Sequence, residues 1–334
     1  MYPYTRLRRT RKHAWLRDLV RETSISPSDL ILPLFITEGV QVRDEINTMP
    51  DVFRLSIDEA LKEIKLAAQY GIKAFALFPC VSNELKTEDA KEALNPNNLI
   101  CRALKAIKEA NLEVGIICDV ALDPYTTHGH DGIVKNSYVD NDITIEVLQQ
   151  QSLILAEAGA DILAPSDMMD GRVRKIREVL EANSYTDIPI LSYAAKYSSS
   201  FYGPFRDAVG SKINLSNGDK KTYQMDIRNS REALLEANLD IEEGADIIMV
   251  KPGMPYLDVI TKLSTNSQVP IFAYQVSGEY AMLKAASKIG AIDYENALIE
   301  SLLCLKRAGT KSILTYGAIE AARIISAKAD FYHY

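Results

Sequence analysis

A helix and a strand are both encoded in the stretch Ser230-Arg-Glu-Ala-Leu-Leu-Glu-Ala-Asn-Leu-Asp-Ile-Glu-Glu-Gly-Ala-Asp-Ile-Ile-Met-Val-Lys251. Its first part, residues 230–243, places apolar side chains three and four positions apart, which predicts an amphipathic helix. Gly244 and Ala245 then supply a small-residue turn of the kind that ends helices. Residues 246–251 form a short apolar run, which predicts a buried strand. The stretch therefore predicts a helix that leads directly into a strand.

The same alternation of strand and helix continues along the chain from Leu30. Strands are expected at residues 30–36, 74–78, 114–120, 161–164, 188–193, 246–251, 269–274 and 312–315. Helices are expected at residues 57–70, 99–110, 143–158, 172–182, 230–243, 279–288 and 294–307. Because the strands feed into helices, we predict an α/β fold in which one parallel sheet closes into a single eightfold β/α (TIM) barrel.

An open doubly wound sheet is the alternative fold. Such a sheet usually carries a glycine-rich fingerprint after its first strand, and Thr37-Glu38-Gly39-Val40-Gln41 has none. No proline-rich or serine-rich linker marks a second domain. We therefore expect an N-terminal arm for subunit contacts over residues 1–28 and a barrel domain over residues 29–334.

Composition narrows the class of protein. The 334 residues include 45 acidic and 38 basic side chains, which gives a net charge of −7. This acidic excess argues against nucleic acid or a membrane surface as the main partner. No apolar run approaches the ~18–20 residues needed to cross a bilayer. The 4 cysteines form neither a disulfide framework nor a CxxC pair, so we expect a cytoplasmic protein.

Two segments depart from the regular pattern. The first 21 residues carry basic side chains at Arg6, Arg8, Arg9, Arg11, Lys12, Arg17 and Arg21. We interpret them as an exposed arm, anchored by Trp15, that contacts acidic surface on the barrel or on a second copy; a transit peptide is the alternative. Residues 196–227 lack a regular period, and we interpret this long aromatic-rich loop as a lid that orders over a ligand.

The chemistry of a β/α barrel lies at the carboxyl ends of its strands. The polar residues expected there are Asp119, Ser166, Asp167, Lys196, Lys251, Ser277 and Tyr316. Lys196 and Lys251 end neighbouring strands about 4.8 Å apart, so burial and mutual repulsion lower their pKa values. A neutral lysine amine forms a Schiff base with a carbonyl compound. The alternative is that each lysine forms a salt bridge with a carboxylate such as Asp119.

The loop after the third strand is rich in acidic side chains. Asp119, Asp123, Asp131, His128 and His130 lie close together in the sequence and offer mainly oxygen ligands. Such a set suits Mg²⁺ better than zinc. The alternative, which the spacing alone favours, is a loop that uses aspartate and glycine for its turns.

Several motifs resemble the porphobilinogen synthase (5-aminolevulinate dehydratase) family. The two longest are Ser192-Tyr-Ala-Ala-Lys196-Tyr-Ser-Ser-Ser-Phe-Tyr-Gly-Pro-Phe-Arg206-Asp-Ala and Met249-Val-Lys251-Pro-Gly-Met-Pro-Tyr-Leu-Asp258. Shorter ones are Ala164-Pro-Ser-Asp-Met-Met-Asp-Gly-Arg172, Val276-Ser-Gly-Glu279 and Ile313-Leu-Thr-Tyr316. The resemblance covers essentially the whole chain. It implies a homo-oligomer, usually an octamer, whose arm wraps a neighbour, and a reaction that joins two 5-aminolevulinate molecules into porphobilinogen for haem biosynthesis.

The resemblance also implies a role for each residue of the site. Lys251 holds the first substrate as a Schiff base, and Lys196 binds the second covalently or assists proton transfer. Asp119 and Ser166 orient reacting groups and move protons. Carboxylate groups are bound by Ser277 and Tyr316 on one substrate and by Arg206 and Lys220 on the other. Tyr202 and Phe205 cover the site.

The metal requirement implied by the resemblance follows from three positions. The zinc-using branch of the family carries cysteines where this chain has Ala121, Asp123 and Asp131. We therefore expect the aspartate-bearing branch, with no active-site zinc, because Cys118 is turned away from the mouth when Asp119 faces it. The branch implies an allosteric Mg²⁺ at Glu232, whereas any ion at Asp123 and Asp131 stays an open question. A different Schiff-base barrel lyase acting on a keto acid is the alternative function.

Overall fold

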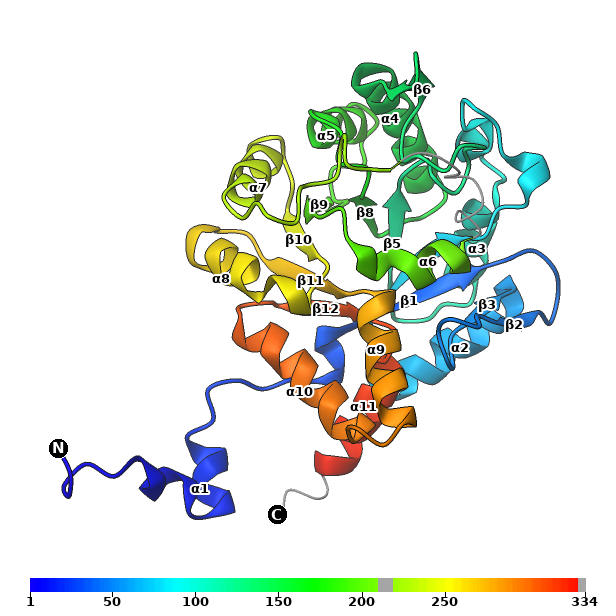
Figure 1. The fold of residues 1–334 in the computed structure, drawn as a ribbon. Helices are drawn as coiled ribbons and strands as arrows, with labels where there is room; N and C mark the ends of the chain where they lie inside the picture. Colours follow the sequence, from blue (N-terminus) through cyan, green and yellow to red (C-terminus); the bar gives the residue numbers. More distant parts are fainter. Residues whose placement is uncertain (210–218, 330–334) are drawn as a thin grey trace.

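The computed structural model describes residues 1–209 and 219–329, and its centre is a parallel β-barrel (Figure 1). The barrel strands are β1 (Leu30–Ile36), β4 (Ala74–Pro79), β5 (Gly115–Val120), β8 (Ile162–Pro165), β9 (Leu191–Lys196), β10 (Ile247–Lys251), β11 (Ile271–Gln275) and β12 (Ser312–Thr315). They pair in the order β8-β5-β4-β1-β12-β11-β10-β9. A parallel bridge between Leu163 and Ile190 joins the two ends of this order. The predicted TIM barrel is therefore confirmed, and the open sheet is excluded.

A ring of helices surrounds the barrel (Figure 1). These helices are α2 (Ile57–Gln69), α3 (Leu99–Glu109), α4 (Asn141–Glu157), α5 (Arg172–Ala182), α7 (Glu232–Glu242), α8 (Leu257–Asn266), α9 (Ser277–Lys288), α10 (Tyr294–Arg307) and α11 (Ala318–Ala329). Gly244, between α7 and β10, has φ of +108°, which confirms the predicted turn, because this left-handed conformation favours glycine. Helices α8 and α11 were not among the predicted helices.

Two short hairpins and two short helices lie outside the eight barrel strands and the ring of helices. β2 (Arg43–Glu45) and β3 (Phe53–Leu55) form an antiparallel hairpin, and β3 also pairs with β1. β6 (Val134–Lys135) and β7 (Tyr138–Val139) form a second hairpin in the acidic loop. The predicted lid contains the short helix α6 (Gly203–Ala208), while residues 210–218 of that prediction lie outside the described residues. Helix α1 (Ala14–Leu19) lies in the N-terminal arm.

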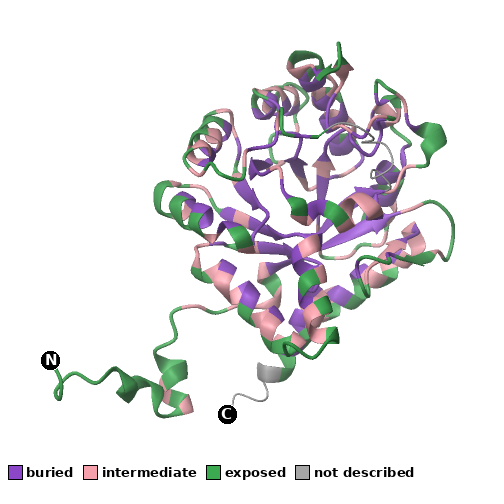
Figure 2. Cartoon of the chain, viewed as in Figure 1, coloured by how far each residue is buried: buried purple, intermediate pink, exposed green. Residues whose placement is uncertain are grey.

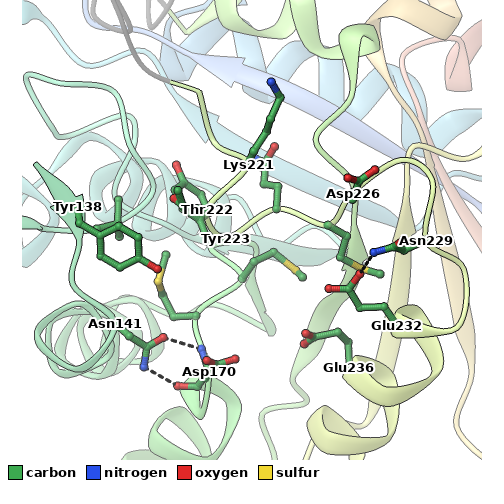
Figure 3. A pocket seen from close by; sticks show the side chains of 15 residues that line it. Tyr138, Asn141, Asp170, Lys221, Thr222, Tyr223, Asp226, Asn229, Glu232 and Glu236 are labelled. Atoms are coloured by element: carbon green, nitrogen blue, oxygen red, sulfur yellow. Dashed lines mark hydrogen bonds between the residues drawn. The ribbon is translucent and has the colours of Figure 1, made fainter.

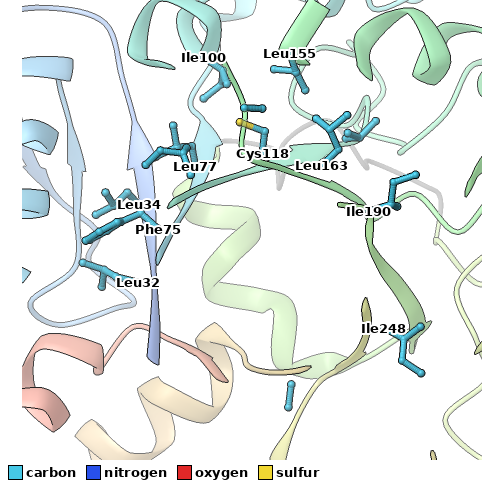
Figure 4. Close-up of a cluster of buried hydrophobic side chains, with 14 of the residues drawn as sticks. Leu32, Leu34, Phe75, Leu77, Ile100, Cys118, Leu155, Leu163, Ile190 and Ile248 are labelled. Atoms are coloured by element: carbon cyan, nitrogen blue, oxygen red, sulfur yellow. The ribbon is translucent and has the colours of Figure 1, made fainter. Parts of the chain in front are cut away.

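The barrel has an inner and an outer core because strand side chains alternate between the two faces. Ile31 and Phe35 of β1 belong to the inner cluster, whereas Leu32 and Leu34 belong to the outer cluster beneath the helices (Figure 4). Cys118 of β5 is buried in the outer cluster, as Figure 4 shows. This placement confirms the prediction that its thiol faces away from the barrel mouth.

The N-terminal arm lies apart from the barrel and is largely exposed (Figure 2). Trp15 is 65% exposed and Leu19 is 75% exposed. Trp15 therefore does not pack against the barrel of its own chain. Contact with a second copy remains a prediction.

Candidate active site

The two lysines predicted at the barrel mouth lie side by side. Lys196 ends β9 and Lys251 ends β10, and the two residues are direct partners in the parallel register. Both side chains line the same pocket at the barrel mouth. Its lining residues are Asp119, Asp123, Asp131, Ser166, Lys196, Tyr202, Phe205, Arg206, Lys220, Gln224 and Lys251. The topology thus gathers most of the predicted site in one place.

Lys251 is surrounded by aromatic rings. Its Nζ lies 4.7 Å from the ring centroid of Tyr274, 5.0 Å from Phe205, 5.2 Å from Tyr193 and 5.3 Å from Tyr202. Among the described residues, no hydrogen bond or ion pair reaches this nitrogen. Burial, helped by the positive charge of Lys196, lowers the pKa of Lys251 to about 7. A substantial fraction of this amine is therefore uncharged at neutral pH and able to attack a carbonyl carbon.

Lys196 differs from Lys251 in its partners. Its Nζ lies 3.0 Å from Oδ1 of Asp131 and also donates a hydrogen bond to the backbone carbonyl of Ser166. The ammonium is therefore ion-paired, which corrects the prediction that both lysines are uncharged. The partner is Asp131 and not Asp119, because the acidic loop returns over the barrel mouth.

Asp119 faces the pocket with an unsatisfied oxygen. Its Oδ1 is buried and, within the described part of the chain, has no hydrogen-bond partner. Burial raises the pKa of this carboxyl to about 6, although a hydrogen bond from Ser166 acts in the opposite direction. A carboxyl group with this pKa exchanges protons readily near neutral pH. These properties suit Asp119 for the proton transfer that the resemblance implies, and that role stays a prediction.

The acidic loop supplies anions that pair with lysines. Lys220 Nζ lies 2.7 Å from Asp131 Oδ2 and 3.3 Å from Asp123 Oδ2. Although burial acts to raise it, Lys196 and Lys220 hold the pKa of Asp131 well below its usual range. Both carboxylates are therefore engaged by ammonium groups, and they do not fit a metal site in this arrangement. The described residues contain no cluster of three or more His, Cys, Asp or Glu side chains that could hold a metal ion.

Gln224 is a pocket residue that the sequence analysis missed. It is buried, it lines the pocket beside Arg206 and Lys220, and its Oε1 has no partner among the described residues. It lies only four positions after Lys220, and its backbone N–H donates to the Lys220 carbonyl. Its position four residues after Lys220, within the predicted lid, is the one feature of the sequence that could have indicated Gln224 as a pocket residue.

Two predicted carboxylate-binding residues lie just outside the pocket lining. The Ser277 hydroxyl accepts a hydrogen bond of 2.9 Å from the Phe205 N–H and donates one of 3.3 Å to the Phe201 carbonyl. The Tyr316 hydroxyl lies 2.8 Å from that of Tyr274. Both hydroxyls are thus engaged with protein groups, Ser277 with the lid and Tyr316 with the inner core.

Comparison with known proteins bears directly on this site. The profile of the family described as delta-aminolevulinic acid dehydratase matches residues 4–324. A delta-aminolevulinic acid dehydratase of Bradyrhizobium diazoefficiens is 54% identical over 317 residues, covering 95% of this chain and 90% of its own. The chain belongs to the delta-aminolevulinic acid dehydratase family.

Other members of the delta-aminolevulinic acid dehydratase family extend the comparison. The crystal structure of the Toxoplasma gondii ME49 enzyme, in complex with the reaction product porphobilinogen, superposes with a TM-score of 0.96. It is 49% identical, and the match covers 99% of this chain and 94% of that one. A relative from Glycine max, also 49% identical over 96% of this chain and 78% of its own, is named as chloroplastic. In the described part of this chain, no helix has the length and apolarity that crossing a membrane requires.

In this family member, Glu232 lines a second pocket (Figure 3), which adjoins the active-site pocket at Gln224. Figure 3 shows Glu232 next to Glu236, with Asp226 on the same side of the pocket and Asp170 on the opposite side, beside Asn141. Glu232 accepts a hydrogen bond of 2.8 Å from Asn229. Burial raises the pKa of Glu236 to about 7. Since Mg²⁺ usually keeps several waters and uses only one or two carboxylates, the donor set fits a hydrated Mg²⁺.

Proposed function

We propose that this chain condenses two molecules of 5-aminolevulinate into porphobilinogen with loss of two waters, an early step of haem biosynthesis. The observation that carries the proposal is the Lys251 amine, held by aromatic rings beside an ion-paired lysine on the adjacent strand. The sequence identity of its relatives supports the same reaction. The chain is accordingly a lyase.

The reaction begins when the Lys251 amine attacks the keto carbon of one substrate. Loss of water from the adduct leaves a Schiff base, whose protonated form withdraws electrons from the neighbouring carbon. Asp119, with its raised pKa, and Ser166 lie where protons move during these steps. Lys196 serves the second substrate, either as a covalent partner or in proton transfer.

The substrate carboxylates give the two molecules fixed and unequal orientations. Arg206 and Lys220 bind one carboxylate, and Lys220 is already partly neutralised by Asp123 and Asp131. Ser277 and Tyr316 bind the other by exchanging their present hydrogen-bond partners for the substrate. Holding both reactants in one dry pocket offsets the entropy lost in a bimolecular condensation.

Borohydride trapping with 5-aminolevulinate tests the proposal. Reduction of the Schiff base fixes the substrate to the attacking lysine, and peptide mapping identifies that lysine. We expect label on Lys251 in the wild-type protein and none at position 251 in Lys251→Arg. An absence of label on Lys251 in the wild-type protein would reject the proposed function.

The alternative function, a keto-acid lyase, leaves the second lysine without a role. Pyruvate offered under the same trapping conditions separates the two activities. A colorimetric assay for porphobilinogen distinguishes the proposed function from a barrel that only binds ligands. Label from pyruvate without porphobilinogen formation would favour the alternative.

We propose that the chain belongs to the aspartate-bearing branch and that Mg²⁺ at Glu232 acts as an allosteric activator. The pocket geometry supports a hydrated ion there, outside the active site. Glu232→Gln is expected to remove stimulation by Mg²⁺ and leave the basal rate unchanged. Glu242→Gln, an exposed position on the same helix, is the control. Unchanged stimulation in Glu232→Gln would place the ion elsewhere.

We also propose a cytoplasmic homo-octamer built through the N-terminal arm. The exposed aromatic and aliphatic side chains of the arm support an interface with a second copy. Sedimentation velocity of the full chain, with and without Mg²⁺, measures the assembly. A monomer under all conditions would contradict this assignment.

A further inference from the structure

Helix α6 is the part of the lid that carries pocket residues. Phe205 and Arg206 of this helix line the pocket, and Phe205 contacts the aromatic surroundings of Lys251. Figure 1 shows α6 lying across the barrel at the ends of the strands. A helix of 6 residues has little stability of its own, so its position depends on contacts with the barrel.

The C-terminal end of α6 is held by one arginine from the β2–β3 hairpin. Arg54 Nε donates a hydrogen bond of 2.7 Å to the Ala208 carbonyl, and its Nη2 donates one of 2.9 Å to the Asp207 carbonyl. These are among the last carbonyls of the helix, which have no partner within the helix. The guanidinium charge also interacts favourably with the negative end of the helix dipole.

Neighbouring residues reinforce this contact. Thr48, on the loop between β2 and β3, donates a hydrogen bond of 2.8 Å to Asp207 Oδ2. Cys80, after β4, donates one of 3.4 Å from its thiol to the Ala208 carbonyl. Arg54 itself sits opposite Phe35 in the β1–β3 register, so its backbone is fixed to the barrel. The arginine therefore connects a strand of the barrel sheet to helix α6.

We propose that Arg54 is a positioning residue that latches α6 closed over the active site. The inference rests on the proposed function, in which Arg206 of α6 binds a substrate carboxylate. Without the latch, the open lid becomes more populated, and the apparent affinity falls in proportion to the fraction that remains closed. Because bound substrate itself closes the lid, the loss appears in KM and not in kcat.

Two measurements test the latch. Hydrogen exchange of the α6 amides, measured without substrate, is expected to accelerate in Arg54→Gln and, less strongly, in Thr48→Val. Steady-state kinetics are expected to show KM raised roughly tenfold in Arg54→Gln, with kcat changed less than about twofold. Arg54→Lys retains one donor and is expected to recover part of the loss.

Arg43→Gln is the matched control, because Arg43 lies on the same hairpin but pairs with Glu63 on α2. Unchanged α6 exchange in a folded Arg54→Gln, or an equal change in Arg43→Gln, would overturn the proposal. If Arg54→Gln fails to fold, the α6 exchange rates of Arg54→Lys and of the variant Thr48→Val, at an exposed position, are compared with that of Arg43→Gln instead. A wild-type protein that makes no porphobilinogen contradicts the proposed function, while the exchange result still decides the latch.

Discussion

At the residue scale, the site depends on two lysines in unlike surroundings. Lys251 has aromatic rings around its amine and no anion within hydrogen-bond distance among the described residues. Lys196, its register partner, is paired with Asp131. Burial of one amine and pairing of the other give a nucleophile and a cation within a single pocket. The arrangement costs stability, as is common for catalytic groups.

The pH dependence of Schiff-base formation follows from the Lys251 amine. Because the pKa of Lys251 is about 7, trapping by borohydride at short times is expected to rise with pH through this value. The positive charge of Lys196 lowers this pKa and the negative charge of Asp119 raises it. Lys196→Met is thus expected to move the midpoint to higher pH, and Asp119→Asn to lower pH. Shifts in the same direction for both variants would contradict this electrostatic account.

The pH dependence of the free energy of unfolding is an independent test of the pKa of the Lys251 amine. The pKa of Lys251 is about 7 in the folded protein against an ordinary value of 10.5. Between these values the unfolded chain binds more protons, so the stability of the wild-type protein rises with pH. Lys251→Met removes the free-energy cost of burying an amine that the unfolded chain keeps protonated. It is expected to raise the free energy of unfolding by on the order of 3 kcal/mol at pH 7.

Urea denaturation at pH 7 and near pH 10 measures this effect. The advantage of Lys251→Met is expected to be largest below pH 7 and to shrink towards pH 10. Lys91→Met, at an exposed side chain, is the control and is expected to show no such trend. If the free energies of unfolding of Lys251→Met and the wild-type protein differed by the same amount at both pH values, packing and not charge would account for the difference.

At the element scale, helix α6 is held near both of its ends by different elements that surround the barrel mouth. Arg54 of β3 holds its C-terminal carbonyls, and Ser277 at the start of α9 holds the Phe205 N–H. Gly278 lies directly against this contact, since a Cβ there would stand 2.5 Å from the Phe201 carbonyl oxygen. The close approach explains why residue 278 is a glycine, although its backbone is not in the left-handed conformation that favours glycine.

Gly278→Ala is therefore expected to displace the lid. The clash involves backbone atoms, so we expect stability to fall by about 1–3 kcal/mol and KM to rise several-fold. Gly203→Ala on α6 is the control, because no atom lies within 4 Å of the position that its added methyl group would take. Its stability is expected to change by less than about 1 kcal/mol. Equal effects in the two variants would argue against the close contact at Gly278.

At the scale of the whole molecule, the barrel and the arm have opposite characters. The barrel buries its apolar residues in two concentric clusters, whereas the arm exposes Trp15 and Leu19 together with many basic side chains. We expect these exposed apolar side chains to be covered by a second copy of the chain, as proposed for the arm.

Substitution of the arm tests this interpretation. Trp15→Ser combined with Leu19→Ser is expected to shift the particle to a smaller size in sedimentation velocity, because the buried apolar area of the interface falls. Val40→Ser, which is 80% exposed on the barrel domain, is the control. An unchanged sedimentation coefficient in the double variant would remove the arm from the interface.

Local sequence patterns were enough to predict the barrel and most of the pocket. Apolar periodicity and glycine turns located its eight strands, and lysines at two strand ends located the chemistry, because strand ends converge in a parallel barrel. Patterns of this kind are encoded within a few residues of each other. They therefore predicted Lys251, Lys196 and Asp119 as neighbours without any knowledge of the tertiary contacts.

The pairing of charges, by contrast, depended on the three-dimensional fold. Asp131 reaches Lys196 and Lys220 because the acidic loop folds back over the mouth, and Arg54 reaches the Ala208 carbonyl across 154 positions of sequence. Ionisation states and lid contacts arise from atoms brought together across the chain, and burial then sets the cost of each charge. No local pattern records those distances, so the sequence predicted the lowered pKa of Lys251, but the pairing of Lys196 with Asp131 became visible only in the folded molecule.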